Sequence, residues 1–248
     1  MSKKPFFIGW EDKPALAPVA HSKSRAILLL VIALGLAGVV AALQQGFRSN
    51  AKWDFTEHTF NGMLLAEPYP TLIADGEVYY LVLQNKQAVA VADATALHLR
   101  TVDVVGSVIA DPDQSVKMIA VKSADAITGA GPAQANPLSL VGVPVPVTLR
   151  GEIVDSKCAF GAMNPATFKP HRACAIMCLA GDIPPVLVVR HDGEGSATHY
   201  LLLDAEGRPM KETALEFAAL PVEITGEVTT VGDWRILKAA PAAVTLLN

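Results

Sequence analysis

The sequence predicts a mainly β protein in which one N-terminal transmembrane helix precedes two tandem small β units, each an OB-like barrel or a β-sandwich. Three observations lead to this prediction: a long apolar run near the N-terminus, short apolar runs rich in β-branched residues after it, and a repeated strand pattern. A short helical, cysteine-rich insert distinguishes the second unit. Because 51% of the residues are hydrophobic and only 18% are charged, the composition excludes a disordered chain.

The apolar run predicts a transmembrane helix over residues 26–47. Residues 26–43 contain no charged side chain, and the whole range would form about 33 Å of helix, which is enough to cross a bilayer. Basic side chains are more frequent in residues 1–25 than just after the run, so we expect a cytoplasmic N-terminal tail. The protein would then be a single-pass protein of the inner (cytoplasmic) membrane with its other domains in the periplasm. A cleaved signal peptide is the alternative, which the long tail disfavours.

The rest of the chain predicts a first β unit over residues 55–127, a small-residue linker over 128–137 and a second β unit over 138–248. Each unit has five strand candidates and a helical signal before the fourth. The candidates are residues 59–65, 77–83, 88–91, 100–109 and 116–121 in the first unit, and 145–155, 185–190, 198–203, 222–230 and 234–240 in the second. This pattern suits a closed OB-type barrel, and a two-sheet sandwich remains the alternative because periodicity does not fix strand order.

The two units repeat one another. Tyr80 and Gly106 of the first unit match Tyr200 and Gly226 of the second, and both pairs are 120 residues apart. This shared spacing favours a duplication over coincidence among valine-rich strands. The matching first strands lie only 89 residues apart, so the second unit holds 31 additional residues after its first strand.

All three cysteines of the chain lie among these additional residues, in an insert predicted over residues 155–184. Cys158 follows the end of the first strand of the second unit. Proline and glycine signals then delimit a short helix, on which His171, Cys174 and Cys178 occur at positions i, i+3 and i+7. This spacing places the three side chains on one face of the helix, where the loop of Cys158 can bend back to meet them.

Three interpretations of this cluster remain open on the sequence alone. The first is a structural disulfide of Cys158 with Cys174 or Cys178, the default for cysteines in an oxidising compartment. The second is a metal site of Cys158, His171, Cys174 and Cys178, whose thiolates and imidazole suit zinc or cuprous copper. The third is a reactive thiol at Cys174, near the positive end of the helix.

The insert is similar to a motif of poorly characterised bacterial membrane-anchored envelope proteins. The similarity is carried by Gly151–Cys158 (GEIVDSKC), Met163–Pro165 (MNP), Lys169–Cys178 (KPHRxCAxxC) and Gly181–Pro185 (GDIPP). It implies a bacterial envelope protein in which the insert acts as a unit. It implies no particular activity.

Charge and motifs narrow the function. The net charge of −4, without a Lys/Arg cluster beyond the N-terminal tail, gives no reason to expect nucleic acid as a partner. The chain contains no nucleophile elbow, phosphate loop, HExxH or CxxCH motif, so an enzyme is disfavoured, although a thiol-based one is not excluded. We expect a membrane-anchored periplasmic accessory or assembly protein of an envelope redox or metal-handling system, whose partners are the membrane and other envelope proteins. The alternative is a structural protein-binding module stabilised by a disulfide.

Overall fold

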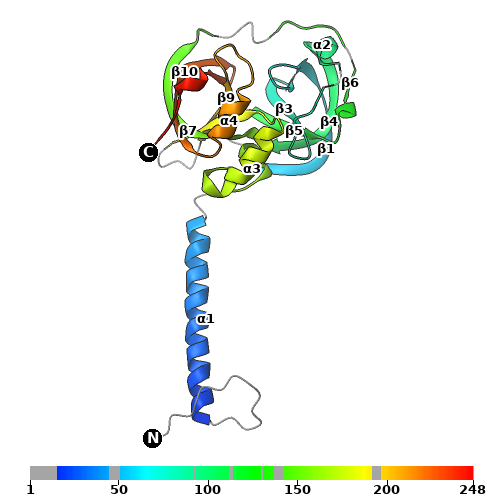
Figure 1. Cartoon of the computed structure of the whole chain (residues 1–248). Coiled ribbons are helices and arrows are strands. Elements are labelled where there is room, and N and C mark those ends of the chain that lie inside the picture. The colour runs from blue at the N-terminus through cyan, green and yellow to red at the C-terminus, as the bar shows by residue number, and fades with distance from the viewer. Residues whose placement is uncertain are drawn as a thin grey trace. The chain divides into compact units, whose positions relative to one another are not determined.

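The computed structural model describes residues 16–44, 51–91, 93–111, 114, 116–129, 131–136, 142–191 and 197–247. The chain divides into two compact units, residues 1–46 and residues 47–248. The first unit contains helix α1 (Leu16–Gln44), and the second contains all of the β structure (Figure 1).

Among the described residues, one helix is long and apolar enough to cross a membrane, as an anchor or as a signal sequence. It is the part of α1 from Lys23 to Leu43, with a mean hydropathy of 2.9, and the unit around it buries none of its side chains. The predicted transmembrane segment coincides with this stretch up to residue 44. Residues 1–15 of the predicted tail and residues 45–47 of the predicted span lie outside the described part of the chain.

The first β unit is a closed barrel of five strands. The strands pair in the order β1-β2-β3-β5-β4, and β4 pairs back onto β1 to close the barrel. Strands β3 and β5 are parallel, whereas the other pairs are antiparallel. Short helix α2 (Ala94–Leu97) precedes β4, and β6 (Ile127–Thr128) extends the sheet beside β4. The strands are β1 (Lys52–Leu65), β2 (Thr71–Ala74), β3 (Glu77–Leu83), β4 (Arg100–Ala110) and β5 (Val116–Val121).

The second β unit repeats this topology. Its strands pair in the order β7-β8-β9-β11-β10, β10 closes on β7, and β9 and β11 are parallel. Helix α4 (Lys211–Glu216) precedes β10, as α2 precedes β4, and β12 (Val244–Leu246) pairs with β10. The strands are β7 (Val145–Asp155), β8 (Pro185–Arg190), β9 (Ala197–Leu203), β10 (Pro221–Val231) and β11 (Trp234–Lys238). Both units are therefore OB-type barrels, and the sandwich alternative is wrong because each sheet closes on itself.

The matching first strands of the two units, 89 residues apart, place Gly62 and Gly151 at equivalent positions of the two barrels. Gly62 lies on β1 against β2, and Gly151 lies on β7 against β8. A Cβ atom on Gly62 would collide with the carbonyl oxygen of Ile73, and one on Gly151 would collide with that of Val188. The same close approach of the first two strands thus requires glycine in both barrels.

One strand prediction in the first barrel was wrong. Residues 88–91 form only a single bridge, between Ala88 and Val82, because the Ala88 N–H donates to the carbonyl of Gly181 in the insert. The sequence analysis missed three short strands, β2, β6 and β12. Strand β2 has four residues. It is joined to β3 by the turn Asp75-Gly76, in which both residues have positive φ, as in a type I′ hairpin.

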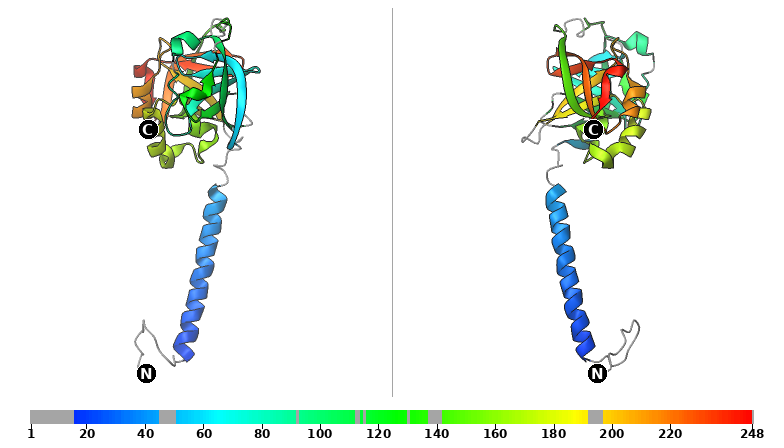
Figure 2. Two further views of the ribbon diagram at one scale, coloured as in Figure 1. Left: turned by 90° about the vertical axis from the view of Figure 1, so that its right-hand side faces the viewer. Right: turned by 60° about the vertical axis from the view of Figure 1, so that its left-hand side comes forward.

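The two barrels share one apolar core between them, in addition to the core inside each barrel. Alternate residues of β3 point to different cores: Leu81 faces the interior of the first barrel, whereas Tyr80 and Val82 face the second barrel. In strand β9, Leu202 faces the interior of the second barrel, whereas Leu201 faces the core shared with the first barrel. These strands are therefore apolar on both faces, and the barrels lie side by side (Figure 1), so that they overlap when the molecule is turned about the vertical axis (Figure 2, left).

Aromatic side chains hold the centre of this shared core. The indole N–H of Trp234 on β11 donates a 2.8 Å hydrogen bond to the hydroxyl of Tyr80 on β3. The ring of Tyr80 also stacks on Phe160 of the insert, with 5.9 Å between the ring centroids. The first barrel, the second barrel and the insert therefore meet at one buried contact.

Candidate functional site

The insert connects β7 to β8 and packs against both barrels. It consists of a short π-helical turn, η4 (Cys158–Ala162), and helix α3 (Phe168–Ala180), which lies beneath the junction of the barrels (Figure 1). The ammonium group of Lys157 donates to the carbonyl oxygens of Leu83 and Asn85 in the first barrel, at 2.7 and 2.6 Å. Gly181 approaches the loop after β3 so closely that a Cβ atom on it would overlap the carbonyl oxygen of Lys86. The insert therefore packs against the loop after β3 of the first barrel.

Helix α3 forms where the sequence predicts it, beginning two residues before Pro170 and ending before Gly181. Its buried side chains are His171, Ala175, Cys178 and Leu179, the spacing of one helical face. At its N-terminus, the Phe168 N–H donates to the carboxylate of Glu152 at 2.7 Å. At its C-terminus, the Lys211 ammonium donates to the carbonyl of Ala180 at 2.8 Å. At each end of α3, one backbone group is therefore bonded to a side chain of the second barrel.

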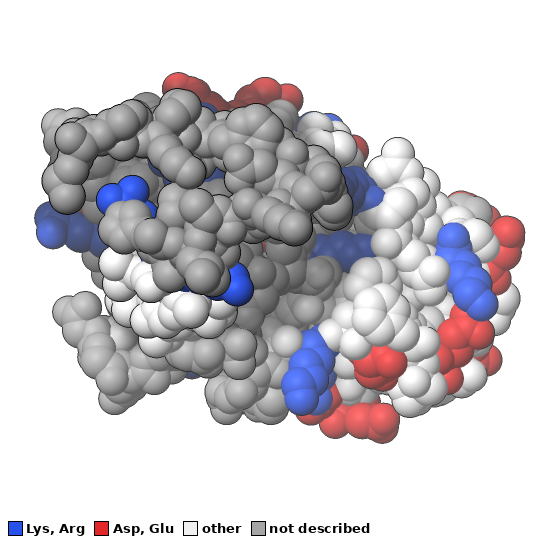
Figure 3. Space-filling view, turned by 90° about the horizontal axis from the view of Figure 1, so that it is seen from below, with Lys and Arg blue, Asp and Glu red and all other residues white. Residues whose placement is uncertain are grey.

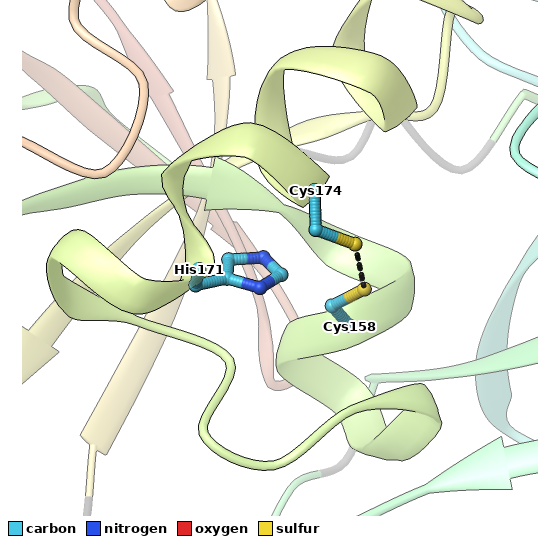
Figure 4. A group of neighbouring side chains, drawn as sticks. All are labelled: Cys158, His171 and Cys174. Atoms are coloured by element: carbon cyan, nitrogen blue, oxygen red, sulfur yellow. Dashed lines mark hydrogen bonds between the residues drawn. The ribbon is translucent and has the colours of Figure 1, made fainter.

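Three of the four predicted site residues form one tight group, Cys158, His171 and Cys174. The sulfurs of Cys158 and Cys174 are 3.7 Å apart, and a ring nitrogen of His171 lies within 4.8 Å of both. Figure 4 shows the edge of the imidazole pointing toward the two sulfurs, which come from η4 and α3. His171 and Cys158 are buried, at 0% and 5% exposure, whereas Cys174 is partly exposed. The group therefore has one solvent-facing side.

Cys178, the fourth predicted residue, is buried one helical turn beyond Cys174. Its sulfur belongs to a second group of mutually close atoms, with Cys158 and a carboxylate oxygen of Asp155, again within 4.8 Å of one another. Cys158 is thus common to both groups. The face predicted from the i, i+3, i+7 spacing exists, but its two ends serve different groups.

A buried carboxylate that the sequence analysis missed orients the site. Asp155, at the end of β7 and 0% exposed, accepts the backbone N–H of Cys158 at 2.8 Å through Oδ1. Its Oδ2 lies 3.0 Å from Nε2 of His171. The remaining nitrogen of His171, Nδ1, is buried and has no hydrogen-bond partner among the described residues. A carboxylate that fixes one imidazole nitrogen and leaves the other as an acceptor is the usual second layer of a metal site.

A lysine from the first barrel reaches the same sulfurs. The ammonium of Lys86, in the loop after β3, lies 2.7 Å from Cys174 Sγ and 3.9 Å from Cys178 Sγ. The hydrogen bond to Cys174 raises the pKa of Lys86 above its ordinary value. Because Lys86 is distant from the cysteines in sequence, no local motif marks it. Only the docking of the insert onto the first barrel brings the cation to the thiols.

Lys157 is a second, buried cation beside the cluster. Burial lowers its pKa to about 8, and besides its two carbonyl acceptors it lies over the ring of Trp53, 4.9 Å from the centroid. The buried ammonium of Lys157 therefore links the insert to the first barrel.

The thiols influence one another. Hydrogen bonding with the Cys178 sulfur, followed by burial, raises the pKa of Cys158 far above the ordinary thiol value. The same interaction with Cys158 lowers the pKa of Cys178, and the nearby Lys86 cation acts in the same direction. The cluster therefore holds thiolate charge unequally, with more on Cys178 than on Cys158.

The disulfide interpretation is not realised in this structure. All three cysteines lie in the described part of the chain, and all three are free. The shortest sulfur contact, 3.7 Å between Cys158 and Cys174, is well beyond the bond length of about 2.05 Å. The periodic face on α3 thus gathers free thiols and an imidazole.

Comparisons with protein families, with curated proteins and with solved structures found no match to this chain. The protein is therefore classified by its own fold and site. It has an N-terminal helix of membrane-spanning length and two fused OB-type barrels, the second of which carries a buried Cys/His cluster.

Proposed function

We propose that this chain is a membrane-anchored periplasmic accessory or assembly protein of an envelope redox or metal-handling system, and that it binds a soft metal ion, zinc or copper, through Cys158, His171 and Cys174 with Cys178 beside them. One observation carries the proposal: His171 has a ring nitrogen within 4.8 Å of the sulfurs of Cys158 and Cys174, and its Nδ1 is buried without a hydrogen-bond partner among the described residues. Leaving a buried polar atom unsatisfied costs about 1–3 kcal/mol. A metal ion bound by the imidazole and the thiolates would remove that penalty.

The proposed location rests on the N-terminal part of the chain. The stretch Lys23–Leu43 has the length and composition of a membrane span, and more basic residues lie before its uncharged part, residues 26–43, than just after it. An anchor with this orientation would hold the barrels at the periplasmic surface of the inner membrane. The resemblance of the insert to envelope proteins supports the same location.

The proposed partners are other envelope proteins. In the part of Figure 3 that is not grey, the described basic and acidic side chains lie among one another. Such a face offers no electrostatic track for a nucleic acid backbone. Mixed charge is compatible with docking to a protein surface.

Metal analysis with thiol counting tests the proposal. The full-length protein is purified in detergent under reducing conditions, reconstituted separately with zinc and cuprous copper, and analysed for bound metal and reactive thiols. We expect about one metal per chain, with thiols protected until a chelator is added. The double variant Cys158→Ser/Cys174→Ser should lose the metal, whereas the matched control Met177→Leu, an exposed position on α3, should retain it. A folded wild-type protein that binds neither metal would overturn the proposal.

The alternative is a binding module fixed by a disulfide, and the three free thiols of the structure give it no support. Thiol counting without metal or chelator also decides this point. Three titratable thiols are expected in the unloaded protein, and a single one would restore the alternative.

A further inference from the structure

We infer that the ion at this site is cuprous copper, held in a three-coordinate set by the sulfurs of Cys158 and Cys174 and a ring nitrogen of His171. The inference rests on the proposed metal-binding function and narrows it to one ion and one set of ligands. It also assigns Cys178 a place beside the metal and outside its coordination.

The first argument is the number of donor atoms that the fold brings together. Zinc in structural sites takes four protein ligands in a tetrahedron. The group that contains His171 holds only two sulfurs, those of Cys158 and Cys174, whereas Cys178 groups with Asp155 and Cys158. Two thiolates and one imidazole are a complete set for cuprous copper, which accepts fewer ligands and prefers soft ones.

The second argument is the spacing along helix α3. His171 and Cys174 are neighbours at i, i+3 on one face, so both can reach one ion. Cys178 is seven residues beyond His171, which is about 10.5 Å along the helix axis. Asp155 holds the imidazole in place, 3.0 Å from Nε2, so His171 cannot swing toward Cys178 without leaving this carboxylate. With the imidazole held there, the group of donor atoms that contains His171 includes Cys158 and Cys174, whereas the sulfur of Cys178 groups with Cys158 and Asp155.

The test is a pair of anaerobic titrations of the reduced full-length protein in detergent, against chromophoric chelators of cuprous copper and of zinc. We expect one cuprous ion per chain. Cys158→Ser and Cys174→Ser should each lower the copper affinity by more than about 100-fold, because loss of a ligand exceeds the 10–100-fold effect of losing an outer partner. The matched substitution Cys178→Ser, at a buried thiol of the same cluster, should lower it by less than about 10-fold.

X-ray absorption of the copper-loaded wild-type protein provides a measurement that needs no variant. We expect two sulfurs and one nitrogen around copper. Three sulfurs around copper, or a zinc complex of four ligands that Cys178→Ser abolishes, would overturn this inference and leave the metal-handling proposal intact. Binding of neither ion would overturn both.

Discussion

The two barrels have the same strand order and differ chiefly in the connection between their first and second strands. In the first barrel, residues 66–70 suffice to join β1 to β2, whereas residues 156–184 join β7 to β8 in the second. The shorter connection shows that the barrel closes without any insert. The longer one holds every cysteine of the chain. Fold and chemistry are thus separable in this protein, yet the insert depends on the first barrel for Lys86 and for the carbonyl groups that hold Lys157.

The largest effect is expected from Asp155→Ala, which removes the carboxylate that only the second barrel has. The change leaves the Cys158 N–H and His171 Nε2 without their buried acceptor. The free energy of unfolding should fall by about 3–5 kcal/mol, as measured by urea denaturation. The control is Asp103→Ala on the first barrel, where an exposed carboxylate accepts only from Asn61. Asp103→Ala should change the free energy of unfolding by no more than about 0.5 kcal/mol. Equal losses of stability in the two variants would contradict the expected difference between the barrels.

The second prediction concerns acid stability and His199 on β9. Burial lowers the pKa of His199 to about 4, and the positive charge of Arg190 acts in the same direction. In the unfolded chain the pKa is about 6.5, so between these values the unfolded state binds more protons than the folded one. Stability should therefore fall as the pH falls from 6.5 to 4, by at most about 3 kcal/mol from this residue.

Denaturation at several pH values, with His199→Phe as the comparison, checks this. The difference in stability between wild type and variant should be constant above about pH 7 and should shift in favour of the variant as the solution is acidified. If the difference in stability between wild type and variant did not change with pH, protonation of His199 would not contribute to the loss of stability in acid.

The third prediction uses the repeat as its own control. Tyr80→Phe removes the acceptor of the buried Trp234 N–H between the barrels, and should destabilise the protein by about 1–3 kcal/mol. The equivalent substitution Tyr200→Phe, at a partly exposed position of β9, should change stability by about 0.5 kcal/mol or less. Similar effects at the two positions would mean that the shared core contributes no more than the barrel surface does.

The smallest effect on stability is expected from Lys86→Met, on the exposed loop of the first barrel. Unfolding free energy should change by no more than about 0.5 kcal/mol. Copper affinity, measured by chelator competition, should nevertheless fall by about tenfold, because the cation next to Cys174 is lost. Lys52→Met serves as the control at another exposed lysine of the same barrel and should leave the affinity unchanged. An unchanged copper affinity in Lys86→Met would show that this lysine of the first barrel does not contribute to metal binding.

Local patterns predicted the barrels and the cysteines and histidine of the site. Alternating apolar residues and the 120-residue repeat indicated two OB-type units, and the i, i+3 spacing of His171 and Cys174 on a helix indicated their proximity. Residues 88–91 misled the analysis because Val89 is buried in the first barrel without belonging to a strand, while the neighbouring Ala88 bonds to the insert. Buried apolar residues do not require strand pairing.

The rest of the site depends on contacts between segments far apart in the chain. Lys86 meets Cys174 across 88 residues, and nothing in the sequence near either residue marks that contact. Asp155 is different, because it stands three residues before Cys158 in a run that ends a strand. A carboxylate at that distance from a cysteine could have been considered as the orienting group for His171.

The shared core between the barrels also bears on why only the second barrel carries the cysteine cluster. The equivalent strands β3 and β9 both turn an apolar face toward the other barrel, which is how two identical subunits meet in a symmetric dimer. In a dimer of identical chains, every insertion and every loop lysine would occur twice. Joining the copies in one polypeptide makes their association independent of concentration and allows each copy to change separately. One copy can then hold the thiols while the other supplies the cation that neutralises them.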